Sequence, residues 1–165
     1  MLHDAIGLAD EGPVAIRYPN GTAPQVGEHE VGVGLHARQL RRGDGSICIL
    51  AVGKLVTFAT QAAHALATHG IDATVWDVRS CAPLDPAMIA DAAGHGSVVT
   101  CEDGVRDGGI GMTIADQIHA IDDATPVHVL GLPARFFPQG SAEKILGQLG
   151  LDAAGIAATA RTLLS

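Results

Sequence analysis

Arg17 and the segment Glu102–Gly111 carry the side chains best suited to chemistry in this sequence. The planar guanidinium of Arg17, at the end of a short apolar triplet, could clamp a phosphate, and a salt bridge is the alternative. Glu102–Gly111 is acidic and glycine-rich and lies between a predicted strand and a predicted helix, where open α/β sheets meet their ligands. A tight turn with solvated charges is the alternative for this segment. Both remain candidates for a binding site.

Three other glycine and serine patterns fail their motif tests. No G-x-S-x-G sequence occurs, so an α/β-hydrolase nucleophile is excluded. Lys54 follows Gly53, as in a phosphate-binding loop, but the next residue is Leu55 and no glycine precedes Gly53 by five positions. Gly109-Ile110-Gly111 begins like a dinucleotide fingerprint, but its third glycine position is Ile114. The sequence therefore assigns no catalytic and no cofactor-binding residue.

The histidines and cysteines do not predict a metal site. Of the eight histidines, His64 and His69 are five apart, which turns them off a common helix face, and no H-E-x-x-H occurs. Cys48, Cys81 and Cys101 form no C-x-x-C pair, which argues against a disulfide framework and a thiolate zinc site. Cys48 and Cys101 adjoin apolar runs, so we expect buried, inert thiols in a reducing cytoplasm.

Composition narrows the class of partner. The 165 residues are 47% hydrophobic with a net charge of -8, so the chain has material for a core and lacks the basic surface of a nucleic-acid binder. No apolar run approaches the roughly 20 residues of a membrane span, and no secretory signal is evident. We expect a cytoplasmic protein that binds neither nucleic acid nor membrane.

Strands and helices are predicted to alternate from residue 46 onward. Apolar runs predict strands over 47–52, 73–78, 97–101 and 126–131. A helix is predicted over 56–69, with Phe58, Ala62, Ala65 and Leu66 on its apolar face. Further helices are predicted after the N-cap Asp85, over 112–121, and after the N-caps Ser141 and Asp152. The helix after Asp85 has Pro86 at its first position and an apolar stripe of Met88, Ile89 and Ala92. This order is typical of an α/β domain, a three-layer sandwich around a mainly parallel sheet.

The first 45 residues follow another pattern. They predict a helix end over 1–8, a strand at 14–16, a turn at 18–21 and a linker over 22–34. Two elements too short to form a core indicate the end of a preceding domain. We therefore divide the chain into residues 1–45, a domain end plus linker, and residues 46–165, one α/β domain.

Several segments together resemble the 1-deoxy-D-xylulose-5-phosphate synthase family. Residues 12–21 are similar to its G-P-x-A-x-R-Y-P-x-G motif, and residues 131–141 to its G-L-P-x-x-F-x-x-H-G-S motif. Residues 49–53, 78–85, 100–104 and 108–111 match in order and spacing. The resemblance covers essentially the whole chain and is specific as a set.

The resemblance implies a transketolase C-terminal domain preceded by the end of a pyrimidine-binding domain. It implies an enzyme, a homodimer, that uses thiamine diphosphate and Mg²⁺ to join pyruvate to D-glyceraldehyde 3-phosphate, for isoprenoid and thiamine biosynthesis. The family's catalytic glutamate and its cofactor and metal motifs lie upstream of Met1, so the isolated chain is expected to be inactive. The family's phosphate-binding arginine falls on Arg17.

Two positions depart from the family pattern, and two other readings stay open. Asn20 stands where the family commonly has a second arginine, and Gln139 where it has a histidine. The chain could instead be a subunit of a split transketolase-like or 2-oxoacid dehydrogenase enzyme that needs a partner chain. It could also be a stand-alone α/β module that binds a ligand through Glu102–Gly111.

Overall fold

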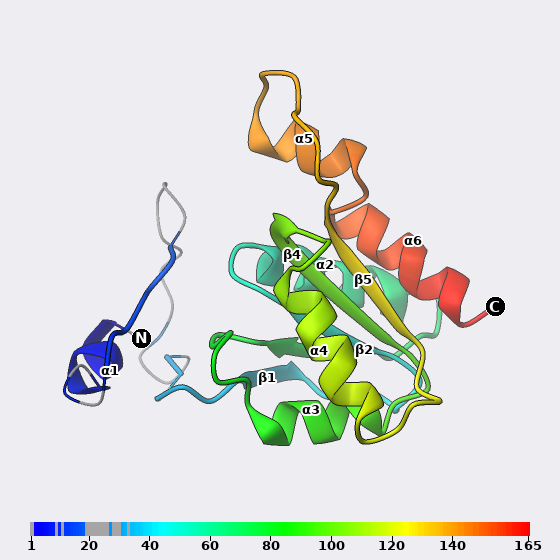
Figure 1. The fold of residues 1–165 in the computed structure, drawn as a ribbon. Coiled ribbons are helices and arrows are strands. Elements are labelled where there is room, and N and C mark those ends of the chain that lie inside the picture. The colour runs from blue at the N-terminus through cyan, green and yellow to red at the C-terminus, as the bar shows by residue number, and fades with distance from the viewer. Residues whose placement is uncertain (1, 9, 11, 19–26, 28–30, 33) are drawn as a thin grey trace.

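One sheet of five strands runs through the described part of the chain (Figure 1). The computed structural model describes residues 2–8, 10, 12–18, 27, 31–32 and 34–165. In spatial order the strands are β1 (Arg38–Arg41), β3 (Thr74–Asp77), β2 (Cys48–Ala51), β4 (Val98–Val105) and β5 (Val127–Leu132). β1 is antiparallel to β3, and the other neighbours are parallel. The predicted mainly parallel sheet is confirmed.

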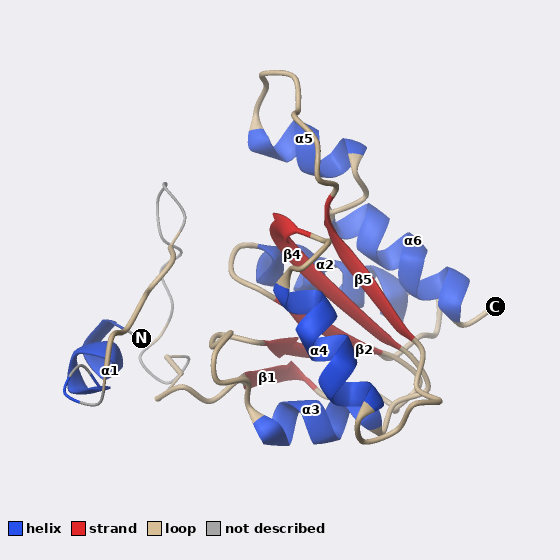
Figure 2. Ribbon diagram, in the orientation of Figure 1, coloured by secondary structure: helices blue, strands red, loops and turns tan. Residues whose placement is uncertain are grey.

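Helices cover both faces of this sheet (Figure 2). α2 (Leu55–Ala67) packs with α6 (Ala153–Leu163) on one face, and α3 (Pro86–Ala93) with α4 (Ile110–His119) on the other. α5 (Ala142–Gln148) projects beyond the sheet, and α1 (Leu2–Leu8) lies apart from it, on the side of the carboxyl ends of the parallel strands. The predicted three-layer α/β sandwich is confirmed.

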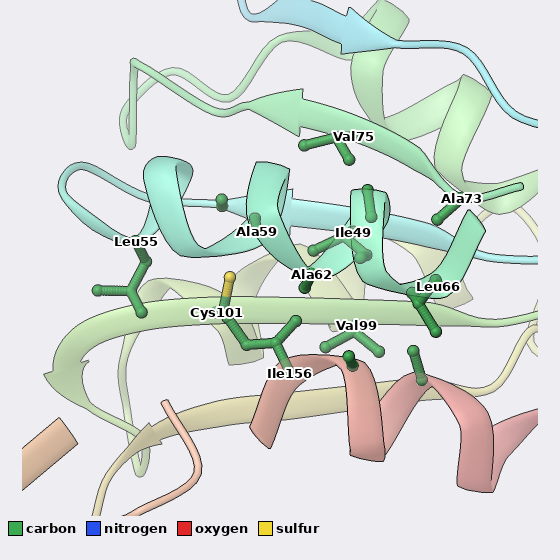
Figure 3. Packing of buried hydrophobic residues seen from close by; sticks show 14 of the residues in the cluster. Ile49, Leu55, Ala59, Ala62, Leu66, Ala73, Val75, Val99, Cys101 and Ile156 are labelled. Carbon is green, nitrogen blue, oxygen red and sulfur yellow. The ribbon is translucent and has the colours of Figure 1, made fainter. Parts of the chain in front are cut away.

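The central strand β2 divides the core into two clusters. Ile49 faces the cluster under α2 and α6, together with Val99 of β4 (Figure 3). Leu50 faces the cluster under α3 and α4. Because both faces of β2 are covered, its sequence is a continuous apolar run rather than an alternating one. Each fully buried aliphatic side chain of this kind stabilises the fold by roughly 1.5–3 kcal/mol.

The apolar face of α2 differs in part from the predicted one. Ala62 and Leu66 are buried as expected, but Phe58 is only partly buried and Ala65 is exposed. The buried residues are Leu55, Ala59, Ala62, Ala63 and Leu66. The prediction was wrong at Ala65 because the buried stripe is centred on Leu55, Ala62 and Leu66, and Ala65 lies beside it on the flank that it shares with Phe58.

Three predicted N-caps are confirmed. The Asp85 carboxylate accepts a hydrogen bond from the backbone N–H of Ala87 at 2.8 Å, with Pro86 at the start of α3. Ser141 caps α5 through the N–H of Lys144 at 3.4 Å, and Asp152 caps α6 through the N–H of Gly155 at 2.8 Å.

Asp85 also ties the chain before β1 to α3. Its second carboxylate oxygen accepts the backbone N–H of Ala37 at 2.9 Å and lies 3.4 Å from Nδ1 of His36. Burial disfavours the charged carboxylate, but the hydrogen bonds from Ala87 and Ala37 outweigh it and lower the pKa of Asp85.

Asp85→Ala should lower the free energy of unfolding by about 2 kcal/mol, because the α3 cap and the link to Ala37 are lost together. Since folding lowers the pKa of Asp85, its contribution is complete above the unfolded-state pKa of about 4 and fades as pH falls below it. Urea unfolding at neutral pH and at acid pH measures this, with the exposed Asp123→Ala as control. If Asp85→Ala lost as much unfolding free energy at acid pH as at neutral pH, the contribution of the ionised Asp85 carboxylate would be contradicted.

Four boundaries differ from the sequence prediction. No strand forms at 14–16: residues 13–18 are irregular, because no described segment pairs with them. β1 lies between the predicted linker and the predicted first strand, where no element was predicted from the sequence. β4 continues to Val105 and α4 starts at Ile110, so the expected loop Glu102–Gly111 is shorter. The helix over 1–8 is confirmed as α1, whereas most of the turn at 18–21 and of the linker lies outside the described residues.

Candidate functional site

The carboxyl ends of the parallel strands gather the candidate residues. Ala51 of β2 pairs in register with Asp77 of β3 and Cys101 of β4, so the residues that follow these strands emerge at one edge. From β2 the chain moves to β3 on one side and then returns to β4 on the other. The loops after β2 and β4 therefore flank a topological switch point, the place where open α/β sheets bind ligands.

Three charged side chains meet at this switch point, and we name Arg17, Lys54 and Asp103 the edge cluster. Arg17 Nη1 lies 3.1 Å from Asp103 Oδ1, and Nη2 lies 3.4 Å from Oδ2. Lys54 Nζ lies 3.3 Å from the same Oδ2. Asp103 is 14% exposed, whereas the Arg17 side chain is 75% exposed. The structure thus brings the two sequence candidates, Arg17 and the segment Glu102–Gly111, into direct contact through Asp103.

Sequence reasoning missed Lys54. It was considered only as part of a phosphate-binding loop, a motif that the sequence does not complete. Its position comes from topology: Gly53, with φ +59, turns the chain sharply from β2 into α2 and places Lys54 at the switch point. The signal available in the sequence was a lysine directly after a buried strand and its closing glycine.

Beneath the edge cluster, Glu102 holds the start of α4. Its side chain is buried, and Oε1 accepts the backbone N–H of Gly111 at 2.9 Å. A Cβ at Gly104 or Gly109 would run into the Glu102 carboxylate, so these glycines form a cradle around it. A carboxylate at a helix N-terminus also interacts favourably with the helix dipole. Glu102 therefore fixes the backbone that carries Asp103.

Cys81, in the loop after β3, borders the edge cluster and is the exposed cysteine of the three. Partial desolvation raises the pKa of its thiol, the Glu102 charge raises it further, and the Arg17 charge lowers it. Burial raises the pKa of Cys48, and it raises that of Cys101 to about 12. The expectation that Cys48 and Cys101 are buried is confirmed.

Arg17→Ala should slow alkylation of Cys81 by iodoacetamide about twofold below the pKa of the thiol, because loss of the cation reduces the thiolate fraction. The measurement is the rate of mass increase on the native chain across pH. Arg161→Ala, which removes an exposed cation on α6, is the matched control. An unchanged or faster rate in Arg17→Ala would contradict this placement of Cys81.

A second polar cluster lies at the amino-terminal edge of the sheet, and sequence reasoning missed it too. Ligand atoms of Cys48, Asp91 and His95 lie within 4.8 Å of one another. Nδ1 of His95 lies 2.7 Å from the Asp91 carbonyl oxygen, and Nε2 lies 2.9 Å from Thr74 Oγ1. The indole N–H of Trp76 donates to the Asp91 carboxylate at 2.8 Å. These hydrogen bonds tie α3 to β3, and the four-residue spacing of Asp91 and His95 was the available signal.

The donor chemistry of these groups does not fit Mg²⁺ with a diphosphate. Mg²⁺ takes oxygen ligands, but the second cluster offers a buried thiol and an imidazole. In the edge cluster, both oxygens of Asp103 are engaged by cations. Among the described residues we therefore assign no ligand to thiamine diphosphate or its metal.

Gln139 and Asn20, the two departures from the family pattern, are not part of the described site. Gln139 is exposed in the segment between β5 and α5. Asn20 lies outside the described residues.

No helix within the described ranges is long and apolar enough to cross a membrane.

Comparison with known proteins places this geometry in a family. Residues 36–156 match the family model for the transketolase C-terminal domain. The chain is 38% identical to 1-deoxy-D-xylulose-5-phosphate synthase of Magnetococcus marinus, over 99% of this chain and 27% of that protein. It is 39% identical to the synthase of Thioalkalivibrio sulfidiphilus, over 96% of this chain and 24% of that one. The chain thus spans about a quarter of the length of these relatives.

Solved structures agree with the fold. A structure described as a split gene transketolase, inactive beta4 tetramer, superposes with a TM-score of 0.75 at 27% identity, covering 86% of this chain and 46% of that one. A transketolase variant from Pichia stipitis gives a TM-score of 0.58 at 19% identity, covering 78% of this chain and 18% of that one, and supports the fold alone. With a matching family model over residues 36–156 and relatives along its whole length, the chain belongs to the transketolase C-terminal domain family.

Proposed function

We propose that this chain is the C-terminal part of a thiamine-diphosphate-dependent synthase that joins pyruvate to D-glyceraldehyde 3-phosphate, giving 1-deoxy-D-xylulose 5-phosphate and CO₂. The observation that carries the proposal is the match to such synthases along 96–99% of this chain. Within that enzyme, residues 1–45 would end the pyrimidine-binding domain and residues 46–165 would form the transketolase C-terminal domain. The enzyme would be a cytoplasmic homodimer using Mg²⁺, and the upstream part of the synthase would be this chain's main partner.

Arg17 is the residue of this chain proposed to bind substrate, through the phosphate of the acceptor. Its guanidinium is 75% exposed at the switch-point edge and already binds a carboxylate through two nitrogens. A phosphate offers two acceptor oxygens to the same planar guanidinium fork and carries more negative charge than a carboxylate. The chain's own contribution is to hold and orient the phosphorylated end of the acceptor, while the cofactor supplies the carbanion chemistry when the full enzyme binds it.

The test separates this chain from the rest of the enzyme. The chain alone, with pyruvate, glyceraldehyde 3-phosphate, thiamine diphosphate and Mg²⁺, should form no product. Joined to the upstream three quarters of a related synthase, it should form product. Product from the chain alone would overturn the claim of inactivity, and a joined enzyme that folds but makes no product would overturn the reaction.

In the joined enzyme, Arg17→Ala should raise the KM for glyceraldehyde 3-phosphate about tenfold or more and leave the KM for pyruvate unchanged. Steady-state kinetics with each substrate varied in turn measures this. Arg161→Ala controls for the loss of an arginine elsewhere. An unchanged acceptor KM would remove Arg17 from phosphate binding.

A second candidate is a separately encoded subunit that is active only with a partner chain. The match to the split gene transketolase favours it, since this chain covers 46% of that chain but only 24–27% of the two synthases. Under this proposal, activity appears on mixing this chain with a second polypeptide that carries the cofactor-binding domain. Coding sequence for the pyrimidine-binding domain that runs without interruption into Met1 would favour the first proposal instead.

A further inference from the structure

We propose that Lys54 is the second cation of the phosphate site, and that Asp103 is an internal anion that holds Arg17 and Lys54 in place until a phosphate replaces it. The inference rests on the proposed function of Arg17 and extends it to Lys54 and Asp103. It concerns a phosphate group on a small molecule, recognised by two cations from separate parts of the chain.

Arg17 and Lys54 both contact the Asp103 carboxylate. Asp103 Oδ2 lies 3.3 Å from Lys54 Nζ and 3.4 Å from Arg17 Nη2, while Oδ1 lies 3.1 Å from Arg17 Nη1. Both cations therefore direct their N–H donors at one small oxygen-bearing group. A phosphate offers the same kind of acceptor oxygens, with at least one further oxygen and more charge.

Charge and burial favour replacement of the Asp103 carboxylate by a phosphate at the two cations. Arg17 and Lys54 bring two positive charges to one carboxylate, Asp103, in a chain whose net charge is -8. The Glu102 carboxylate beneath them is buried and accepts the Gly111 N–H instead. Asp103 is 14% exposed and lies beneath the cations, whereas Arg17 and Lys54 are 75% and 35% exposed. An incoming anion thus reaches the cations from the solvent side without passing the carboxylate.

The surrounding backbone adds to the preference for an anion. α2 begins directly after Lys54 and α4 begins after Gly109, both at the switch-point edge. Neither helix has a side-chain N-cap hydrogen bond. The partial positive charge of the α2 N-terminus therefore adds to the charge of Lys54, whereas the N-terminus of α4 is already occupied by the Glu102 carboxylate, which accepts the Gly111 N–H.

The rival interpretation is a surface salt bridge in which Lys54 and Asp103 merely stabilise each other. The two interpretations differ in what happens to phosphate binding when either partner is neutralised. If Asp103 competes with phosphate for the two cations, Asp103→Asn strengthens phosphate binding and Lys54→Gln weakens it. If the pair is only a surface salt bridge, neither substitution changes phosphate binding.

The experiment titrates the 165-residue chain with inorganic phosphate at constant ionic strength and follows amide shifts of Gly53–Leu55 and Asp103–Gly104 by NMR. Lys54→Gln should raise Kd about fivefold, Lys54→Arg should restore most of it, and Asp103→Asn should lower Kd about threefold or more. Lys144→Gln removes the other lysine of the sequence, on the projecting α5, and should leave Kd unchanged. The amide spectrum of each variant verifies its fold.

The outcomes distinguish this inference from the proposed function. If Arg17→Gln weakens phosphate binding but Lys54→Gln stays within twofold of the unsubstituted chain, Lys54 is not part of the site and only this inference fails. If Asp103→Asn weakens binding, the competing role of Asp103 is wrong. If phosphate produces no saturable shift up to about 100 mM, or Arg17→Gln has no effect, the inference and the phosphate role of Arg17 fail together, whereas the synthase reaction is still judged by the joined enzyme.

Discussion

Gly111→Ala should lower the free energy of unfolding by about 3 kcal/mol, because the position leaves no room for a methyl group. A Cβ there would lie 2.6 Å from Thr100 Oγ1 and 2.7 Å from Val129 Cγ1. Thr100 lies in β4 and Val129 in the neighbouring strand β5, both under α4, so α4 would have to move away from the sheet. Such a shift also breaks the 2.9 Å hydrogen bond from the Gly111 N–H to Glu102.

Thermal and urea unfolding of the variant measure the effect. For a chain of this size, a loss of about 3 kcal/mol corresponds to a fall in Tm of roughly 6–12 °C. Gly94→Ala is the matched control: Gly94 lies at the end of α3 and is exposed, and a Cβ there would come no nearer to a neighbour than 3.4 Å, the distance to the Asp91 carbonyl oxygen. If both alanine variants are equally stable, the tight contact between α4 and the sheet is not as described.

Glu102→Ala should cost about 3 kcal/mol as well, for a different reason. The substitution leaves the Gly111 N–H without its acceptor and empties the cradle formed by Gly104 and Gly109. Glu102→Gln keeps an oxygen and nearly the same volume, so it should retain at least half of the lost stability. Urea midpoints with unchanged m values measure both variants.

The exposed Glu143→Ala on α5 controls for the loss of a glutamate and should change stability by no more than about 0.5 kcal/mol. A Glu102→Ala variant as stable as the unsubstituted chain would show that the carboxylate does not hold the turn after β4. Equal losses in Glu102→Ala and Glu102→Gln would show that charge, rather than hydrogen bonding and volume, dominates.

The elements that the sequence predicted well are those whose signals are local. Asp85, Ser141 and Asp152 are N-caps whose side chains accept backbone hydrogen bonds within the same turn, so a few residues determine them. The apolar run of β2 required only that both sheet faces be covered. Local sequence therefore fixed the α/β class and most element positions.

The failures arise where tertiary contacts override local preference. Glycines at 104, 109 and 111 indicate a loop, yet Gly104 lies in β4 and Gly111 in α4. Glycine is required at these positions because neighbouring side chains leave no space for a Cβ. Residues 38–41 are mostly polar and became a strand only through pairing with β3. The edge cluster joins residues 86 positions apart, and no local pattern predicts that Lys54 also reaches Asp103.

The polar strand β1 also determines how the sheet ends. It covers β3, carries Arg38 and Arg41, and its pairing register shifts between Gln39 and Arg41. A chain starting at residue 46 would leave the N–H and C=O groups of β3 open to an extended strand from another molecule, a common route to aggregation. The short strand β1, with its arginines and its register shift, thus replaces the open side of β3 with one on which a strand from another molecule pairs poorly.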